Sequence, residues 1–179
     1  MTIVVGYKTK NKVVIAADSQ GTAGYDKSNR ADQKVFVTHG IGYGFCGSYR
    51  MGQIIKFHST KLKLPKHEPY GFVVTDLVPM WRRLLAKHGS LYKSENIDGN
   101  LGSFILAVNG HLFTVESDFQ VAEQEELFTA QGCGAAYALG SLFTTASVDM
   151  PIKDKVICAI TAAQAFSSGC GGRIDYLKV

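Results

Sequence analysis

The residues best suited to chemistry in this chain are a threonine near its start, Thr2, and two charged residues that follow it, Asp18 and Lys34. If Met1 is removed, Thr2 carries a hydroxyl group and a free α-amino group on one residue. An α-amino group titrates at about pH 8, so it can accept the hydroxyl proton near neutral pH. While Met1 is attached, the nitrogen of Thr2 is an amide and cannot serve as a base. The plain alternative is that Thr2 is an ordinary strand residue.

The order of the predicted elements is strands, two helices, strands, two helices and a final strand. The predicted strands cover 2–7, 13–18, 34–38, 41–46, 101–108, 111–116, 127–130 and 173–179, and the predicted helices cover 49–57, 73–89, 135–146 and 152–166. Asn11 and Asn109-Gly110 mark hairpin turns, Pro79 predicts a kink, and 21–30 predicts a loop or a loose strand pair. Because the helices come in pairs, we expect an α+β fold built in layers.

The composition is that of an ordinary globular protein. The 179 residues fit a single domain over 1–179, with 46% hydrophobic residues and a net charge of +4. The lysine-containing stretch 56–66 is interleaved with apolar residues, which favours a solvated helix end over nucleic-acid binding. No stretch is apolar enough to span a membrane and the first residues lack a signal-peptide pattern, so we expect a cytoplasmic protein. No two of the four cysteines form a C-x-x-C pair, so neither a zinc site nor a disulfide scaffold is indicated. We expect no metal and no cofactor.

The glycines between positions 42 and 47 spell G-x-G-x-x-G, the pattern of a dinucleotide-binding turn. That turn follows the first strand of a β-α-β unit, whereas the strand here is predicted to belong to a hairpin. An acidic residue to hold a ribose is also missing about 20 residues further on. We therefore favour another interpretation, in which the bare backbone brings N–H groups close to a reacting carbonyl, as an oxyanion hole requires.

Several motifs, taken in their order and spacing, resemble one protein family. They span nearly the whole chain and are Thr2-Ile-Val-Val-Gly6, Val13-Val-Ile-Ala-Ala-Asp18, Lys34, Gly44-Phe-Cys-Gly47, Gly132-Cys-Gly134, Ala159-Ile-Thr-Ala-Ala163 and Gly171-Gly-Arg-Ile-Asp175. These motifs resemble the catalytic β-subunits of proteasomes and the peptidase subunit of the bacterial ATP-dependent heat-shock protease. The resemblance implies an N-terminal nucleophile hydrolase, an α+β fold arranged as a four-layer αββα sandwich.

The resemblance also implies roles for individual residues. Thr2 would attack a peptide carbonyl through its hydroxyl, and its amine would act as the base through a water. Lys34 would favour loss of the hydroxyl proton, and Asp18 would orient Lys34. The N–H of Gly44 would donate to the oxyanion. Without the family, Asp18 and Lys34 would be interpreted as a surface ion pair contributing about 0–1 kcal/mol.

Three positions depart from the family pattern around the threonine. Proteasome subunits carry serines where this chain has Cys133 and Cys170, and an aspartate where it has Ser167. In the family those groups surround the threonine amine and help to set its protonation. A thiol is a weaker hydrogen-bond partner than a hydroxyl, and Ser167 supplies no charge, so we expect a less efficient amine base. If both thiols flank Thr2, they can form an oxidation-sensitive site; the alternative is two small buried residues without a redox role.

Three functions stay open at this point. The first is a threonine peptidase subunit of a homo-oligomeric ring that acts on peptides or unfolded proteins, with an ATP-dependent unfoldase as a candidate partner. The second is a ring-forming relative without proteolytic activity, and the third is an amidohydrolase of the same fold acting on a small amide. Asp32 lies near the expected specificity pocket and would favour basic side chains. Neither a nucleic acid nor a membrane is expected as a partner.

Overall fold

The strands and helices follow one another largely as predicted. The computed structural model describes residues 1–10, 12–94 and 97–179. In the first half, the elements are β1 (Ile3–Lys8), β2 (Val13–Asp18), β3 (Gln20–Ala23), β4 (Asp26–Asn29), β5 (Val35–Thr38), β6 (Ile41–Gly47), α1 (Tyr49–His58), α2 (Pro69–Phe72), the π-helical η1 (Val73–Leu77) and α3 (Val78–Lys87). The second half contains β7 (Tyr92–Ser94), β8 (Ile97–Gly99), β9 (Gly102–Val108), β10 (His111–Val115), β11 (Val121–Glu123), β12 (Phe128–Gly132), α4 (Ala135–Ala146), α5 (Ile152–Phe166) and β13 (Ile174–Lys178).

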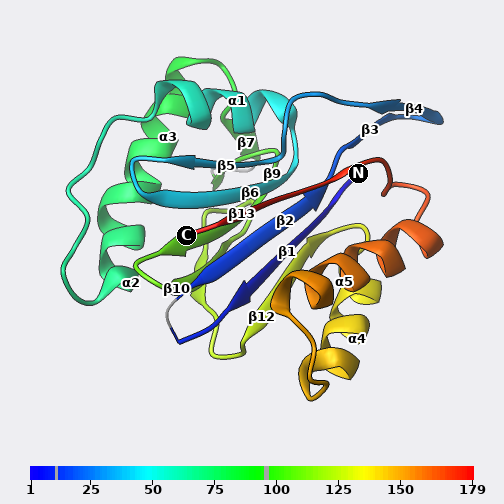
Figure 1. Ribbon diagram of the computed structural model, residues 1–179. Helices are drawn as coiled ribbons and strands as arrows, with labels where there is room; N and C mark the ends of the chain where they lie inside the picture. The colour runs from blue at the N-terminus through cyan, green and yellow to red at the C-terminus, as the bar shows by residue number, and fades with distance from the viewer. Residues whose placement is uncertain (11, 95–96) are drawn as a thin grey trace.

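Two antiparallel sheets lie face to face at the centre of the protein, and helices cover the outer face of each (Figure 1). The first sheet has the strand order β12-β1-β2-β13, and the second has the order β11-β10-β9-β6-β5. Helices α4 and α5 pack on the first sheet, while α1 and the α2–α3 segment pack on the second. The structure is therefore the predicted α+β fold in four αββα layers.

Three apolar cores fill the three interfaces between these layers. Ile3 and Val5 of β1 belong to the core shared with α4 and α5, which also contains Leu142. Val4, between them, belongs to the core that joins the two sheets. The third core surrounds the fully buried Trp81 of α3. This alternation follows from the two-residue period of a strand, and it explains why β1 is apolar on both faces.

The hairpin of β1 and β2 places Thr2 and Asp18, two of the predicted catalytic residues, at the same end of the first sheet. Its register pairs Val4 with Ala17, so the start of β1 lies beside the end of β2. Thr2 immediately precedes β1 and Asp18 is the last residue of β2, which places both at the same end of the sheet. The hairpin is confirmed, while Asn11, the predicted turn residue, lies outside the described residues.

The second helical segment differs from the prediction at its start. It begins at Pro69, four residues before the predicted start at residue 73, and passes through the π-helical turn of η1 before α3. In this turn the N–H of Val78 bonds to the carbonyl of Val73. A proline inside a regular α-helix clashes with the preceding turn, and the wider π-turn immediately before Pro79 provides a place to relieve that clash. Within the described ranges, no helix is long and apolar enough to cross a membrane.

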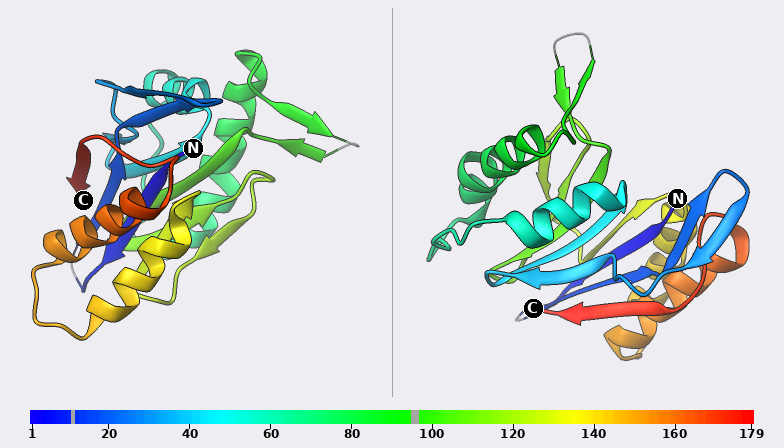
Figure 2. Two further views of the ribbon diagram at one scale, coloured as in Figure 1. Left: turned by 90° about the vertical axis from the view of Figure 1, so that its right-hand side faces the viewer. Right: turned by 90° about the horizontal axis from the view of Figure 1, so that it is seen from above.

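Short strands were the elements that the sequence pattern missed. The β7–β8 pair and β11 have only three residues each, too few to show a clear alternation of apolar and polar residues. The loose strand pair expected within 21–30 is present as the β3–β4 hairpin. Both hairpins project from the layered body, and the β3–β4 hairpin lies on the side of the N-terminus (Figure 2).

Candidate active site

Thr2 is buried at the end of the first sheet, with 2% of its surface exposed. Its amide N–H donates to Sγ of Cys133 at 3.3 Å, and its hydroxyl donates to the carbonyl oxygen of Met1 at 2.5 Å. Met1 itself is half-exposed and packs close to Gly169, in the segment that joins α5 to β13 (Figure 1). While Met1 is attached, it therefore binds the hydroxyl of Thr2 and also keeps the Thr2 nitrogen in an amide bond.

Asp18 and Lys34 form an ion pair beneath Thr2, away from solvent. Nζ of Lys34 lies 2.7 Å from Oδ1 of Asp18, and it also donates to the carbonyl oxygen of Gln20 at 2.7 Å. The carboxylate of Asp18 accepts two further bonds, from the N–H of Ile3 at 3.1 Å and from the N–H of Gly171 at 3.0 Å. The structure thus brings Asp18 and Lys34 together and ties them to the residue that follows Thr2.

The surface-pair alternative for Asp18 and Lys34 is wrong, because their side chains are only 0% and 1% exposed. Taking two charges out of water costs several kcal/mol per ion unless their remaining polar sites are satisfied. Here the carboxylate accepts three bonds and the ammonium group donates two. These bonds hold the lysine in one place, which suits a site that must position a charge.

Cys133, Ser167 and Cys170 gather on the other side of Thr2. Sγ of Cys133 lies 3.7 Å from Sγ of Cys170, and the hydroxyl of Ser167 donates to Sγ of Cys133 at 3.5 Å. Cys133 in turn donates to the carbonyl oxygen of Thr2 at 3.4 Å. These three residues come from the β12–α4 junction and from the loop after α5, so residues more than 130 positions from Thr2 surround it.

Gly44 does not join this cluster. It lies in the middle of β6, where it pairs with Val35 on one side and with Ile105 on the other. The next residue, Phe45, donates its N–H to the carbonyl of Lys34 across the β5 side. Since successive N–H groups along a strand point to opposite sides, the N–H of Gly44 points toward β9, inside the sheet. The prediction that Gly44 donates to an oxyanion therefore does not fit the structure.

Gly44 instead serves the packing between the two sheets. A methyl group placed on it would lie 2.5 Å from Cγ1 of Val4 and 2.7 Å from Cγ2 of Ile15, closer than carbon atoms can approach. The absence of a side chain therefore lets the first sheet lie close against β6. The same glycine pattern that suggested an exposed backbone reflects a tight fit in the core.

Gly47, at the end of β6, is the glycine that suits the oxyanion role. By the same alternation its N–H points to the side on which Lys34 lies, and β5 begins only at Val35, so that strand does not cover it. Its φ is 97°, and a side chain there would lie 2.2 Å from the carbonyl oxygen of Leu101, so only glycine fits. The sequence contained this signal, since Gly47 directly precedes the N-cap of α1.

Two residues of the site were missed by sequence reasoning. Gln20 and Gly171 act through main-chain atoms, which leave no signature in residue type.

Asp32, predicted to favour basic substrates, forms a two-pronged ion pair with Arg30, with both N–O distances at 2.8 Å. The hydrogen bond from Arg30 holds the pKa of Asp32 below its usual value. Its effect on substrate preference stays a prediction.

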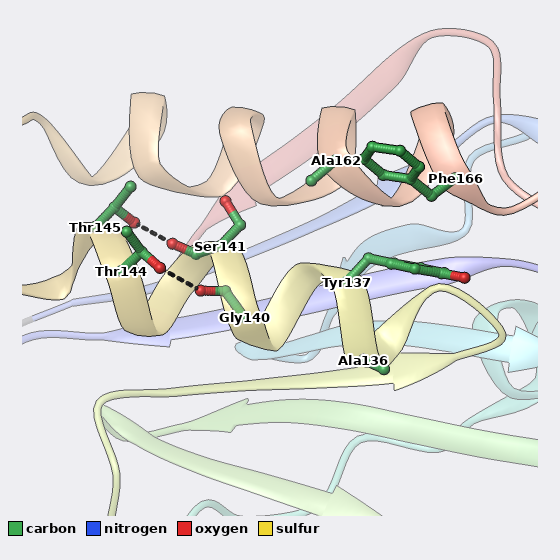
Figure 3. A pocket seen from close by; sticks show the side chains of 8 residues that line it. All are labelled: Ala136, Tyr137, Gly140, Ser141, Thr144, Thr145, Ala162 and Phe166. Atoms are coloured by element: carbon green, nitrogen blue, oxygen red, sulfur yellow. Dashed lines mark hydrogen bonds between the residues drawn. The ribbon is translucent and has the colours of Figure 1, made fainter.

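A separate hollow lies on the outer face of the protein, between α4 and α5 (Figure 3). Tyr137 and Phe166 border it, and Figure 3 shows their rings lying on neighbouring helices at one end. The hydroxyl groups of Thr144 and Thr145 bond to carbonyls one turn earlier in the same helix, so they are already satisfied. None of the residues that line the hollow carries a charge.

Comparison with known proteins agrees with this arrangement. No family model matches the chain. Among curated proteins, proteasome subunit beta 1 of Pyrobaculum aerophilum is 28% identical over 189 residues, which cover 100% of this chain and 90% of that protein. Over that length the chain is similar to a proteasome β-subunit. The buried Asp18–Lys34 pair beside Thr2 is thus found in a chain related over its full length to a proteasome subunit.

Solved structures show the same fold. Thiobacillus denitrificans BPH covers 99% of this chain and 97% of its own, with a TM-score of 0.83 and 19% identity, and its complex with epoxomicin gives a TM-score of 0.81. Eukaryotic HslV from Trypanosoma brucei covers 98% of both chains, with a TM-score of 0.68 and 16% identity. The proteasome-type fold is therefore retained at identities that leave few residues in common.

Proposed function

We propose that this chain is a threonine-type endopeptidase subunit whose nucleophile is Thr2, exposed by removal of Met1. The observation that carries the proposal is the buried, hydrogen-bonded Asp18–Lys34 pair, anchored to the N–H of Ile3 directly after Thr2. The relation to a proteasome β-subunit supports a peptidase in general terms. The assignment of the individual roles belongs to the proposal.

The chemistry would proceed in two steps on the hydroxyl of Thr2. In the first, the free α-amine takes the hydroxyl proton, directly or through a water, while the oxygen attacks the peptide carbonyl. The ammonium group of Lys34 favours the deprotonated oxygen by its charge, and Asp18 keeps that group in place. The N–H of Gly47 would stabilise the oxyanion. The peptide C–N bond then breaks as the leaving nitrogen takes that proton from the α-amine, which leaves an ester on Thr2. In the second step water hydrolyses the ester, which releases the acyl group and restores the hydroxyl.

The surroundings of the amine differ from the family pattern, and we expect slower catalysis as a result. Sγ of Cys133 is the partner of the Thr2 nitrogen, at 3.3 Å, where the family places a serine. Sulfur accepts hydrogen bonds weakly, so the amine would be less firmly oriented. Ser167 donates to Cys133 and brings no charge to the site.

Intact-mass and N-terminal analysis of the natively expressed protein, combined with a fluorogenic-peptide assay, tests this proposal. We expect the Met1-free protein to cleave peptides and Thr2→Ala to lose that activity. Thr75→Ala is a matched control, because Thr75 is exposed on the other helical layer. Epoxomicin, which the solved neighbour from Thiobacillus denitrificans binds, serves as a probe that should stabilise the Met1-free form more than the Met1-bearing form.

The outcome distinguishes the two competing functions. A protein that natively keeps Met1 and cleaves no peptide, even after Met1 is removed by an aminopeptidase, would be a relative without proteolytic activity. Hydrolysis of small amides without cleavage of peptides or casein would indicate an amidohydrolase. Either result would overturn the peptidase assignment.

We also propose a homo-oligomeric ring that encloses the sites, with an ATP-dependent unfoldase as a partner and a cytoplasmic location. The family relation supports the ring in general, since proteasome subunits assemble in this way. Sedimentation of the native protein measures the assembly, and a monomer at working concentration would contradict it.

A further inference from the structure

Cys133 and Cys170 come from distant parts of the chain and meet beside Thr2. Cys133 follows β12, whereas Cys170 lies in the turn between α5 and β13. Their sulfur atoms are 3.7 Å apart. A disulfide needs a separation of about 2 Å, so the two sulfurs are in contact and have only a short distance to close before they can bond.

Two glycines, Gly134 and Gly169, leave room for the sulfur atoms of Cys133 and Cys170 to lie in contact. A methyl group on Gly134, the neighbour of Cys133, would lie 2.8 Å from Sγ of Cys170. A methyl group on Gly169, the neighbour of Cys170, would lie 2.6 Å from Sγ of Cys133. Each cysteine is thus flanked by a glycine that leaves room for the sulfur of the other, so both loops are shaped to hold the two sulfurs in contact.

The two thiols differ in exposure and acidity. Cys133 is exposed and Cys170 is buried. Burial raises the pKa of the Cys133 thiol, but hydrogen bonds with Ser167, the Thr2 N–H and Cys170 outweigh it, so the pKa lies below its usual value. Cys133 also precedes the first turn of α4, where the helix field favours a thiolate. Burial raises the pKa of Cys170 to about 12, which keeps that thiol protonated.

We propose that Cys133 and Cys170 form a peroxide-sensitive redox pair, in which Cys133 reacts first and Cys170 resolves. The thiolate of Cys133 attacks one oxygen of hydrogen peroxide, the O–O bond breaks, and the leaving hydroxide takes a proton to become water. The product is a sulfenic acid on Cys133. The sulfur of Cys170 then attacks the sulfur of Cys133, the S–O bond breaks, and the departing hydroxide takes the Cys170 proton. Two thiols are oxidised to one disulfide, and one peroxide is reduced to two waters.

The disulfide would change the surroundings of Thr2. The thiol of Cys133 now accepts from the N–H of Thr2 and donates to its carbonyl oxygen. In the disulfide, this sulfur has no proton to donate and is turned toward Cys170. Oxidation would therefore remove a partner of the Thr2 main chain and switch peptide cleavage off until a thiol reductant restores it. This consequence rests on the proposed function, whereas formation of the disulfide does not.

Peroxide treatment of the native protein, followed by thiol blocking and non-reducing peptide mapping, tests the pair directly. We expect a cross-linked peptide containing Cys133 and Cys170, lighter by two hydrogens than the two thiol peptides, which dithiothreitol removes. Cys170→Ser should instead accumulate a sulfenic acid on Cys133 that a dimedone-type reagent traps. Cys158→Ser is the matched control, because Cys158 is exposed elsewhere on α5, and it should form the cross-link as the native protein does.

Two results would overturn the proposal. One is oxidation of Cys133 to the sulfinic acid in the native protein without any cross-link to Cys170. The other is equal dimedone labelling of Cys133 in the native protein and in Cys170→Ser, which would show that Cys170 does not resolve. The native-protein measurement holds even if the variant folds poorly. Peptide cleavage is followed in parallel: a cross-link in a protein that cleaves nothing in either redox state refutes the peptidase function and leaves the redox pair standing.

Discussion

Lys34 donates a 2.7 Å hydrogen bond to the carboxylate of Asp18, with both side chains withdrawn from solvent. The same carboxylate oxygen accepts the N–H of Ile3, so the ion pair is fixed to the residue that follows Thr2. This bond therefore links the position of the lysine to the main chain beside the proposed nucleophile. The cost of burying the pair is offset by four hydrogen bonds, and the result is a cation held in one position.

Replacing Lys34 with methionine should abolish peptide cleavage and lower the free energy of unfolding by about 3–5 kcal/mol, because the Asp18 carboxylate is left buried without a countercharge. Urea unfolding measures the second effect. The matched control is Arg30→Gln, which removes the partly exposed pair with Asp32 and should cost about 1 kcal/mol or less. Equal losses of stability in the two variants would contradict the buried character of the Asp18–Lys34 pair.

Replacing Gly44 with alanine should lower the free energy of unfolding by about 1–3 kcal/mol, because the added methyl group meets Val4 and Ile15. Activity per folded molecule should change little if the N–H of Gly44 serves only the sheet. Gly47→Ala provides the comparison, since it strains a backbone with a φ of 97° and disturbs the proposed oxyanion donor. A selective loss of turnover in Gly44→Ala would restore the original assignment.

The rate of Cys133 alkylation should reach half of its maximum at a pH below 9.0, the ordinary pKa of a thiol. The reason is that hydrogen bonds to the Cys133 sulfur outweigh its burial and favour the thiolate. Iodoacetamide labelling of the reduced protein, followed by peptide mapping, gives the rate at each pH. Ser167→Ala removes one of those bonds and should shift the profile to higher pH. An unshifted profile would show that Ser167 does not set the acidity of Cys133.

Replacing Gly134 with alanine should slow formation of the disulfide, because the new methyl group would stand 2.8 Å from Sγ of Cys170 and push the two sulfurs apart. It should also lower the free energy of unfolding by about 1–3 kcal/mol through contact with Ala163. Gly140→Ala, at a position on α4 with open space around it, is the control for adding a methyl group to this helix. Cross-linking as fast as in the native protein would show that the glycine does not serve the approach of the sulfurs.

The sequence alone determined the elements whose signal is local. The β-branched and apolar content of 2–7 and 13–18 and the helical character of 135–146 and 152–166 predicted these elements correctly, since each depends on neighbours a few residues away. Short strands such as β11 were missed because three residues carry too little periodicity. The pairing of helices, taken from chain order, predicted a layered α+β fold, and the resemblance to proteasome subunits supplied the four αββα layers.

The tertiary structure decided which of the candidate site residues lie together. The sequence singled out Thr2, Asp18 and Lys34, but only the stacking of the sheets shows that the charged pair is buried and joined to Ile3. Sequence could not separate Gly44 from Gly47, because the direction of an N–H depends on strand pairing and not on residue type. In the same way, Cys133 and Cys170 became a pair only when β12 and the loop after α5 met at Thr2, a contact between chain segments that no local pattern encodes.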